Sequence, residues 1–381
     1  MRPRRGRLAP AAPASIAIVA THWLGDTFWA LQIVPFLRRV HPEARIDLLV
    51  RPSLVWLARQ WAPDDRVHGL RSLVSDRHRE GLPRPWRILA EARSVREKLG
   101  RPDLWIDLTS TPAAALFTGT LRPRFALGMG SRRFTARAFD LWRASGEFDG
   151  HLAARPWWVL EPAYAEHGTW PSPDEHMRPV FPTAVGAIGT ADAPAPPPCA
   201  EDRRRVLLFP GAGWPKKRWP LARFVELAFQ LERDGWGVEL LFAPAEEAIA
   251  GETSRMLASE APIGPAASGT IRLRVTEGPQ MHHALLRASA VVSNDSGAAH
   301  LAAALGLPTV ALFGPTNPAR CGPLGPRVSV LCCDCRERPV GGQHHCLDRP
   351  RASCGRDCLG SIDVTAVRRT LVGLLEAGSP S

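Results

Sequence analysis

The sequence predicts an α/β protein built from two parallel-sheet domains. Short apolar runs alternate with amphipathic stretches, the alternation falls into two halves, and a proline-rich segment separates them. The 381 residues leave room for two or three domains at about 150 residues each. With 45% hydrophobic and 22% charged residues, the composition excludes collagen-like, coiled-coil and wholly disordered chains. No stretch of about 18 residues is apolar without charge or proline, so we expect no membrane-spanning helix.

The N-terminal half is predicted to form one domain over residues 15–184. Its strand candidates are the apolar runs 16–20, 46–50, 104–108 and 124–127. Residues 1–14 look superficially like a signal peptide, but Pro10 and Pro13 break the apolar part and no good cleavage site follows. We therefore expect a basic disordered tail and a protein that stays in the cytoplasm.

The C-terminal half is predicted to form a second domain over residues 205–375. Its strand candidates are 206–210, 237–243, 290–293, 309–313 and 328–331. Apolar residues at helical spacing predict a helix over 220–234, and cap residues followed by a glycine stop predict another from Asp295 to Gly306. Residues 185–204 are rich in Pro and Ala, which predicts an interdomain linker. Two such domains imply a cleft between them.

The net charge and the distribution of the basic residues indicate which classes of partner the protein can bind. The chain has 48 Lys and Arg against 37 Asp and Glu, a net charge of +11. The arginines are spread in several patches rather than in one stripe interleaved with aromatics, which disfavours a nucleic acid partner. Two interpretations stay open: an anionic partner such as a phosphorylated glycolipid or a membrane surface, and an arginine-rich composition without a binding role.

Six of the eight cysteines fall in a loop over 332–358. The zinc-ligand candidates there are Cys333, Cys335, Cys346, Cys354 and Cys358. Only the last two have the spacing of a zinc-binding pair. A loop of free thiols is therefore the favoured interpretation, and zinc is the alternative.

The segment 291–300 is a buried strand, a turn of small residues and the start of a helix. First-turn N–H groups have no partner inside a helix, and the helix dipole adds positive potential there, so this end can hold a phosphate, with Gly297 allowing close approach. We expect Asp295 to accept hydrogen bonds from sugar hydroxyls, or else to cap the helix. Ser296 and His300 lie four residues apart on one helical face, so both can meet a ligand; for His300, a structural histidine is the alternative.

The segment 209–220 also follows a strand and holds three adjacent cations in a stiff loop of Trp, Pro and Gly. The spacing is not that of a Walker loop. Lys217 or Arg218 can neutralise a diphosphate leaving group, and a solvated basic loop is the alternative. Just past the first strand lies Gly25-Asp26-Thr27. There an acid either caps a helix or takes a proton from an acceptor hydroxyl.

At these residues the sequence resembles a known family. PGAGWPKKRWP and SNDSGAAHLAAALGLPTVALFGPTNP resemble the two C-terminal signatures of glycosyltransferase family 9, whose best-known members are ADP-heptose:lipopolysaccharide heptosyltransferases. The opening LGDTFWALQIVPFLRRVHPEARIDLLV and the closing CLGSIDVTAV are similar to the ends of that family. The resemblance covers roughly residues 15–375 and is only an outline over about 65–185.

The resemblance implies a GT-B fold, in which two Rossmann-like domains face each other across a cleft. The acceptor then binds mainly to the first domain and the nucleotide-sugar donor to the second. It implies an inverting transfer without a cofactor or divalent metal. Asp26 matches the general base and Lys217 the lysine at the donor diphosphate. The remaining donor-side candidates are Gly211, Arg218, Glu246, Asp295, Ser296, Gly297 and His300; for Glu246, a solvated charge at a helix start is the alternative.

The acceptor side departs from the family. Thr27, Phe28 and Trp29 replace the usual small aliphatics after Gly-Asp, so Gly25 and Thr27 are acceptor candidates in a reshaped site. Arg132 and Arg133 are candidates for phosphates of a lipid-linked saccharide, or belong to a solvated loop. We expect a heptosyltransferase of the lipopolysaccharide inner core, working at the cytoplasmic face of the inner membrane. The alternatives are another nucleotide-sugar donor for an O-chain, capsule or small glycoside, a sugar-nucleotide epimerase, and a nucleotide-sugar-binding protein without turnover.

Overall fold

The computed structural model describes residues 9–73, 84–130, 133–166, 168, 170–179, 181, 204–260, 271–332 and 358–377. The chain divides into two compact units, Met1–Pro182 and Thr183–Ser381. The predicted linker lies outside the described residues except for residue 204, and the predicted N-terminal tail lies outside them up to residue 8.

Unit 1, Met1–Pro182, is built on a six-stranded sheet with the order β3-β2-β1-β4-β5-β6, and all of its neighbouring strands are parallel. Its strands are β1 (Ser15–Ala20), β2 (Arg45–Val50), β3 (Val67–Gly69), β4 (Leu104–Asp107), β5 (Phe125–Gly130) and β6 (Leu141–Ala144). Its α-helices are α1 (Leu24–Leu31), α2 (Val34–Val40), α3 (Val55–Ala58), α4 (Pro85–Leu99), α5 (Pro112–Leu121), α6 (Arg155–Tyr164) and α7 (Pro173–His176).

Unit 2, Thr183–Ser381, repeats this plan with the order β12-β11-β10-β7-β8-β9, again all parallel. Its strands are β7 (Arg205–Phe209), β8 (Gly237–Phe242), β9 (Ile271–Val275), β10 (Ala290–Asn294), β11 (Thr309–Phe313) and β12 (Val328–Cys332). Its α-helices are α8 (Leu221–Arg233), α9 (Glu247–Glu260), α10 (Gly278–Leu286), α11 (Gly297–Ala304), α12 (Pro318–Cys321) and α13 (Val364–Glu376).

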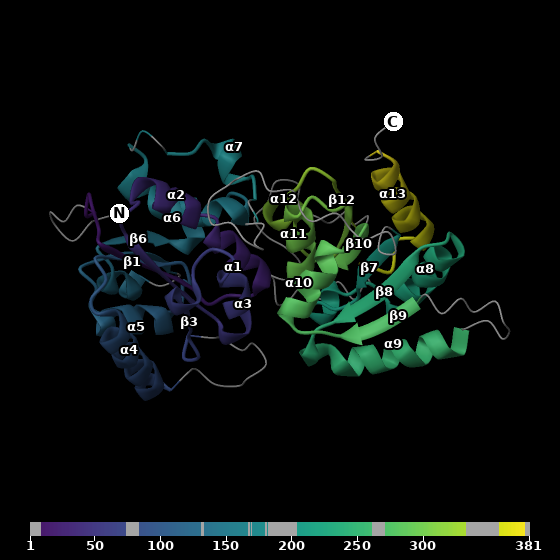
Figure 1. Cartoon of the computed structure of the whole chain (residues 1–381), viewed down its shortest axis with the longest axis horizontal. Coiled ribbons are helices and arrows are strands. Elements are labelled where there is room, and N and C mark those ends of the chain that lie inside the picture. The colour runs from purple at the N-terminus through teal and green to yellow at the C-terminus, as the bar shows by residue number, and fades with distance from the viewer. Residues whose placement is uncertain are drawn as a thin grey trace. The chain divides into compact units, whose positions relative to one another are not determined.

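Each sheet is covered by helices that bury its central strands (Figure 1). In unit 1, α4 and α5 lie side by side and pack apolar residues such as Ile88 and Phe117 against Trp105 of β4. In unit 2, α8 and α13 pack Phe224 and Val367 against the strands. In the part of the chain that the structure describes, no helix is both long and apolar enough to span a bilayer.

The predicted α/β fold with two parallel sheets is confirmed. All nine predicted strands are present with shifts of at most a few residues at their ends. The two predicted helices are α8 and α11, each followed by a glycine with a left-handed backbone, Gly235 at φ 81° and Gly306 at φ 75°. Strands β3, β6 and β9 were not predicted.

Candidate functional site

The strand order places a candidate ligand site at one edge of unit 2. From β9 to β12 the order is 3-2-1-4-5-6, and the connections reverse direction between β7 and β10. In open α/β sheets, ligands bind beyond the carboxyl ends of the strands at this switch point. The two loops that follow β7 and β10 carry most of the predicted donor-side residues.

Asn294, the last residue of β10, joins these two loops. Its Oδ1 accepts a hydrogen bond from the Trp219 N–H (2.9 Å), and its Nδ2 donates to the Pro210 carbonyl oxygen (2.7 Å). The Trp219 indole is fully buried and donates from Nε1 to the Ile362 carbonyl (3.0 Å). One buried amide therefore fixes both ends of the β7–α8 loop against the neighbouring strand.

Asp295, the residue after Asn294, forms an ion pair with Lys217. Lys217 Nζ lies 2.6 Å from Asp295 Oδ2, and the Thr316 hydroxyl donates to the same oxygen at 2.5 Å. Asp295 is buried and Lys217 is half-buried, so the pair is partly shielded from solvent. An ammonium has three N–H donors, and the contact with Asp295 uses one of them. The arrangement holds a cation in a fixed place at the carboxyl edge of the sheet.

The amino end of α11 lies directly beside this pair in the sequence. Ser296 precedes the helix, Gly297 is its first residue, and the buried His300 follows one turn later. The Ser296 hydroxyl shares a hydrogen bond with the Ser293 hydroxyl (3.0 Å). First-turn N–H groups and the helix dipole give this end a positive potential, which together with Lys217 suits a phosphate group.

Glu246 brings a third loop of unit 2 to the same edge. It ends the short 3-10 turn Pro244–Glu246 after β8, and its Oε2 accepts from the Ala243 N–H (2.9 Å). Burial raises the pKa of its carboxyl above the usual range, while that N–H group and the charge of Arg218 act in the opposite direction. A Cβ atom at Gly211 would overlap the Glu246 carboxyl group, so glycine is required for this close packing.

Arg218 braces the β7–α8 loop from within. Its Nε and Nη2 both donate to the Ala212 carbonyl oxygen, at 3.1 and 3.0 Å. All the predicted donor-side residues thus lie in segments that follow β7, β8 or β10, at the carboxyl edge of one sheet.

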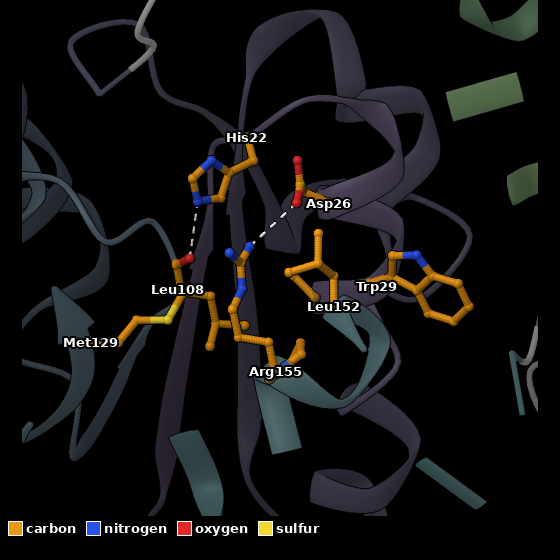
Figure 2. A pocket seen from close by; sticks show the side chains of 9 residues that line it. His22, Asp26, Trp29, Leu108, Met129, Leu152 and Arg155 are labelled. Atoms are coloured by element: carbon orange, nitrogen blue, oxygen red, sulfur yellow. Dashed lines mark hydrogen bonds and ion pairs between the residues drawn. The ribbon is translucent and has the colours of Figure 1, made fainter. Parts of the chain in front are cut away.

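Unit 1 has a pocket at the corresponding edge, after β1 (Figure 2). Its lining is mostly apolar and consists of His22, Asp26, Trp29, Ala30, Leu108, Met129, Leu152, Arg155 and Pro156. Asp26 lies in the first turn of α1, and its Oδ1 is 3.3 Å from Arg155 Nη2. The His22 ring contacts the Leu108 carbonyl oxygen through Nε2 at 3.1 Å. The pocket therefore holds a carboxylate that is paired with a guanidinium among apolar side chains.

The other predicted acceptor-side residues lie in different surroundings. Gly25 is in the first turn of α1 with Asp26. Thr27 is fully buried, and its hydroxyl donates to the carbonyl oxygens of Ala20 (3.3 Å) and His22 (3.2 Å), which ties the loop to β1. Arg132 lies outside the described residues, and Arg133 begins a 3-10 turn over Arg133–Ala138.

Most of the cysteine candidates cannot be placed. Cys333, Cys335, Cys346 and Cys354 lie outside the described residues, and Cys358 is half-buried ahead of α13. Within the described ranges, no three His, Cys, Asp or Glu residues are grouped so that they could hold a metal ion.

Sequence reasoning assigned no role to Asn294, Thr316 or Arg155. The first two lie inside the SNDSG and GPTNP motifs, so the motifs themselves could have pointed to them. Arg155 has no such signal, because it is 129 residues away from its partner Asp26 and begins α6, outside these motifs.

The chain is similar to known transferases. The family model described as "Glycosyltransferase family 9 (heptosyltransferase)" matches residues 92–345. Lipooligosaccharide heptosyltransferase 2 of Haemophilus influenzae is 33% identical over 131 residues, which cover 34% of this chain and 37% of that protein. Lipopolysaccharide heptosyltransferase 1 of Pseudomonas aeruginosa is 39% identical over 121 residues, covering 32% and 31%. The chain thus aligns with about a third of the length of these curated relatives.

Solved structures resemble the whole fold. The structure of E. coli ADP-heptose lps heptosyltransferase II matches with a TM-score of 0.69 at 21% identity, covering 95% of this chain and 99% of that one. The E. coli heptosyltransferase WaaC, solved with ADP, matches with a TM-score of 0.63 at 18% identity, covering 94% and 99%. At these identities the likeness shows a shared GT-B fold.

Proposed function

The chain belongs to glycosyltransferase family 9, and from this premise we propose that it is an inverting heptosyltransferase. In this proposal it moves a heptose from ADP-heptose to a sugar of the lipopolysaccharide inner core. The observation that carries the proposal is the fixed Lys217 cation beside the amino end of α11, with Asp295 held against it. Support for heptose comes from the named relatives, all of which are heptosyltransferases.

In the proposed reaction, unit 2 binds the donor. Lys217 and the first-turn N–H groups of α11 neutralise the diphosphate, which gains negative charge as it leaves. Asp295 accepts hydrogen bonds from hydroxyls of the donor sugar, and Glu246 accepts them from the nucleoside ribose. Ser296, Gly297 and His300 complete the phosphate side. The reaction requires no cofactor and no divalent metal, because the cation and the helix end supply the positive charge.

Unit 1 binds the acceptor and supplies the base. Asp26 takes the proton of the acceptor hydroxyl while the hydroxyl oxygen attacks the anomeric carbon of the donor. The bond from that carbon to the diphosphate oxygen breaks on the opposite side, and its electron pair leaves with ADP. The configuration at the anomeric carbon is therefore inverted.

The acceptor is proposed to be a lipid-linked, phosphorylated saccharide. The net charge of +11 favours an anionic partner, and Arg132 and Arg133 follow β5, another strand of the unit 1 sheet. With such an acceptor the enzyme works at the cytoplasmic face of the inner membrane as a peripheral protein.

The donor is tested by the thermal stability of the purified protein with ADP, UDP or GDP. A ligand that binds only the folded protein stabilises it by about 2.7 kcal/mol at a hundredfold excess over Kd, so a clear rise in Tm is expected with ADP. The rise should be lost in Lys217→Ala and kept in Lys216→Ala, because the neighbouring Lys216 is exposed in the same turn. A response to UDP or GDP alone would replace the donor, and no response to any nucleotide would contradict the proposal.

The reaction is tested by incubating the protein with ADP-heptose and lipopolysaccharide from a heptose-deficient strain, with mass spectrometry of the product. We expect addition of one heptose and release of ADP. Asp26→Asn should abolish transfer and change ADP affinity by only a few-fold, because it removes the base from unit 1 and leaves unit 2 unchanged. Normal turnover in Asp26→Asn would refute the assignment of the base.

A further inference from the structure

The start of α6 is held firmly against α1. The short turn Leu152–Ala154 leads into α6, and His151 Nδ1 accepts a hydrogen bond from the Ala153 N–H (3.1 Å). The His151 ring meets the Trp29 indole edge-on, with ring centroids 6.1 Å apart. Leu152 and Pro156 line the pocket together with Trp29. The first residue of α6, Arg155, therefore has a fixed backbone position opposite Asp26.

The Arg155 guanidinium reaches from this position to Asp26. Nη2 lies 3.3 Å from Oδ1, with 21% of the Arg155 side chain and 30% of the Asp26 side chain exposed. Figure 2 shows the paired oxygen pointing toward Arg155 and the second carboxylate oxygen pointing away from it. A partly shielded ion pair of this kind limits the rotation of a carboxylate more than a fully exposed pair does.

The residues that line the pocket indicate how the Asp26–Arg155 pair can assist a catalytic base. Apart from Asp26, the pocket lining contains two residues that can carry charge, His22 and Arg155, among apolar side chains such as Leu108 and Met129. A carboxylate beside apolar groups is poorly solvated, and a cation next to it favours its charged form. An aspartate must be charged to accept a proton, and it must point at the hydroxyl from which it takes that proton.

We propose that Arg155 is a positioning residue for the transfer reaction: it holds Asp26 through Oδ1 and directs the other carboxylate oxygen toward the acceptor hydroxyl. This inference rests on the proposed function, because it assumes that Asp26 is the base. In this role Arg155 does not touch the reacting atoms. It acts through the orientation of Asp26 and belongs to neither the donor nor the acceptor contacts.

The test compares Arg155→Ala and Arg155→Lys with a matched control in the transfer assay with ADP-heptose and heptose-deficient lipopolysaccharide. The control is Arg143→Ala, which removes another arginine–carboxylate pair that involves α6. In that pair Arg143 Nη1 lies 2.6 Å from Glu161 Oε2, and the Arg143 side chain is 22% exposed. Arg143 does not line the pocket. The melting temperature of each variant checks that loss of activity is not loss of folding.

We expect Arg155→Ala to lower kcat by about 10- to 100-fold with the KM of both substrates within about threefold, because a misdirected base loses rate rather than binding. Arg155→Lys should recover part of kcat, and added guanidinium ion should recover part of it in Arg155→Ala. The control should keep kcat within about twofold. In an Asp26→Glu background, Arg155→Ala should cost less than in the wild type, because the longer side chain no longer meets the guanidinium in the same way.

Three results would overturn the proposal when the wild type is active: an unchanged kcat in Arg155→Ala, a loss that appears as a raised acceptor KM, and an equal cost in the Asp26→Glu background. The second result would make Arg155 an acceptor-binding residue. If the wild type transfers no sugar at all, the proposed function fails and this inference fails with it, which is a different observation from an active wild type with an active Arg155→Ala.

Discussion

The two units share one strand order and differ in what the carboxyl edge of each sheet carries. In unit 2 the edge holds a cation, a helix end and an acid from three neighbouring loops, represented by Lys217, Gly297 and Glu246. In unit 1 it holds a mostly apolar pocket in which Asp26 is paired with Arg155. The same topology therefore brings different chemistry to equivalent places, and function has to be inferred from the side chains at each edge.

The two edges differ most clearly at the last residue of β4 in unit 1 and of β10 in unit 2, the fourth strand of each unit along the chain. In unit 2 this residue is the fully buried Asn294. It donates one hydrogen bond to the β7–α8 loop and accepts another from it. In unit 1 it is Asp107, also buried, which accepts from the Thr109 N–H (2.8 Å) and the Thr118 hydroxyl (3.4 Å). An amide can both donate and accept, whereas a carboxylate only accepts, so the two positions should respond in opposite ways to exchange.

The largest effect is expected from Asn294→Asp. A carboxylate there would face the Pro210 carbonyl oxygen without a proton to donate, in a fully buried place. We expect a loss of about 3 kcal/mol or more in the free energy of unfolding at pH 7, because a buried charge is left opposite an acceptor. Urea denaturation would measure it. The loss should shrink at low pH, where the carboxyl is protonated and can donate.

The control is Asn317→Asp, the same exchange at the start of α12. Asn317 Oδ1 accepts from the Ala319 N–H (3.0 Å), so toward the described residues this side chain acts as an acceptor. Asp and Asn cap helices about equally well, so the stability should change by less than about 0.5 kcal/mol. Equal effects of the two exchanges would remove the distinction drawn for Asn294.

Asp107→Asn is expected to raise the free energy of unfolding relative to wild type as the pH increases, the opposite of the loss expected for Asn294→Asp. Burial raises the pKa of Asp107 to about 6, so the folded protein binds this proton more tightly than the unfolded chain, for which the value is 3.8. Below about pH 4, the tighter proton binding by Asp107 in the folded state adds to the free energy of unfolding of the wild type. This contribution is lost as the pH rises to about 6. Asparagine does not titrate. The stability of the variant relative to wild type should rise over this range by up to about 3 kcal/mol, at 1.36 kcal/mol per pKa unit.

Urea midpoints of the two proteins between pH 4 and pH 7.5 would measure this rise. The comparison with wild type cancels the titration of all other groups. A difference that stays constant with pH would mean that Asp107 titrates alike in the folded and unfolded chains.

The sequence predicted the central strands of both sheets and the edge strand β12, and it missed the other three edge strands. β3, β6 and β9 each end a sheet, and β6 and β9 are partly exposed along their length, so they lack the apolar run that marks the central strands. The predicted linker and most of the cysteine candidates lie outside the described residues.

The unit 2 site and the unit 1 site also differ in how far the sequence could predict them. The unit 2 residues lie in strand–turn–helix segments, where a short motif marks each candidate, although their contacts, such as Lys217 with Asp295, join separate segments. The unit 1 pair joins Asp26 to a residue 129 positions away. Local patterns in one sequence carry no information about such a contact, so Asp26 was predicted and Arg155 was not.

The smallest effect is expected from Gly211→Ala, which tests whether the edge of unit 2 depends on close packing between loops. The added methyl group would overlap the carboxyl group of Glu246 and push that side chain aside. If Glu246 contacts the nucleoside ribose, ADP affinity should fall about tenfold, equivalent to about 1.4 kcal/mol, while Tm without ligand changes little.

Gly213→Ala is the matched control in the same loop, because a Cβ atom there meets nothing within 4 Å. Calorimetric titration with ADP would distinguish the two variants. Equal affinities would show that Glu246 contributes nothing to nucleotide binding, and the donor site would then depend on Lys217 and the end of α11 alone.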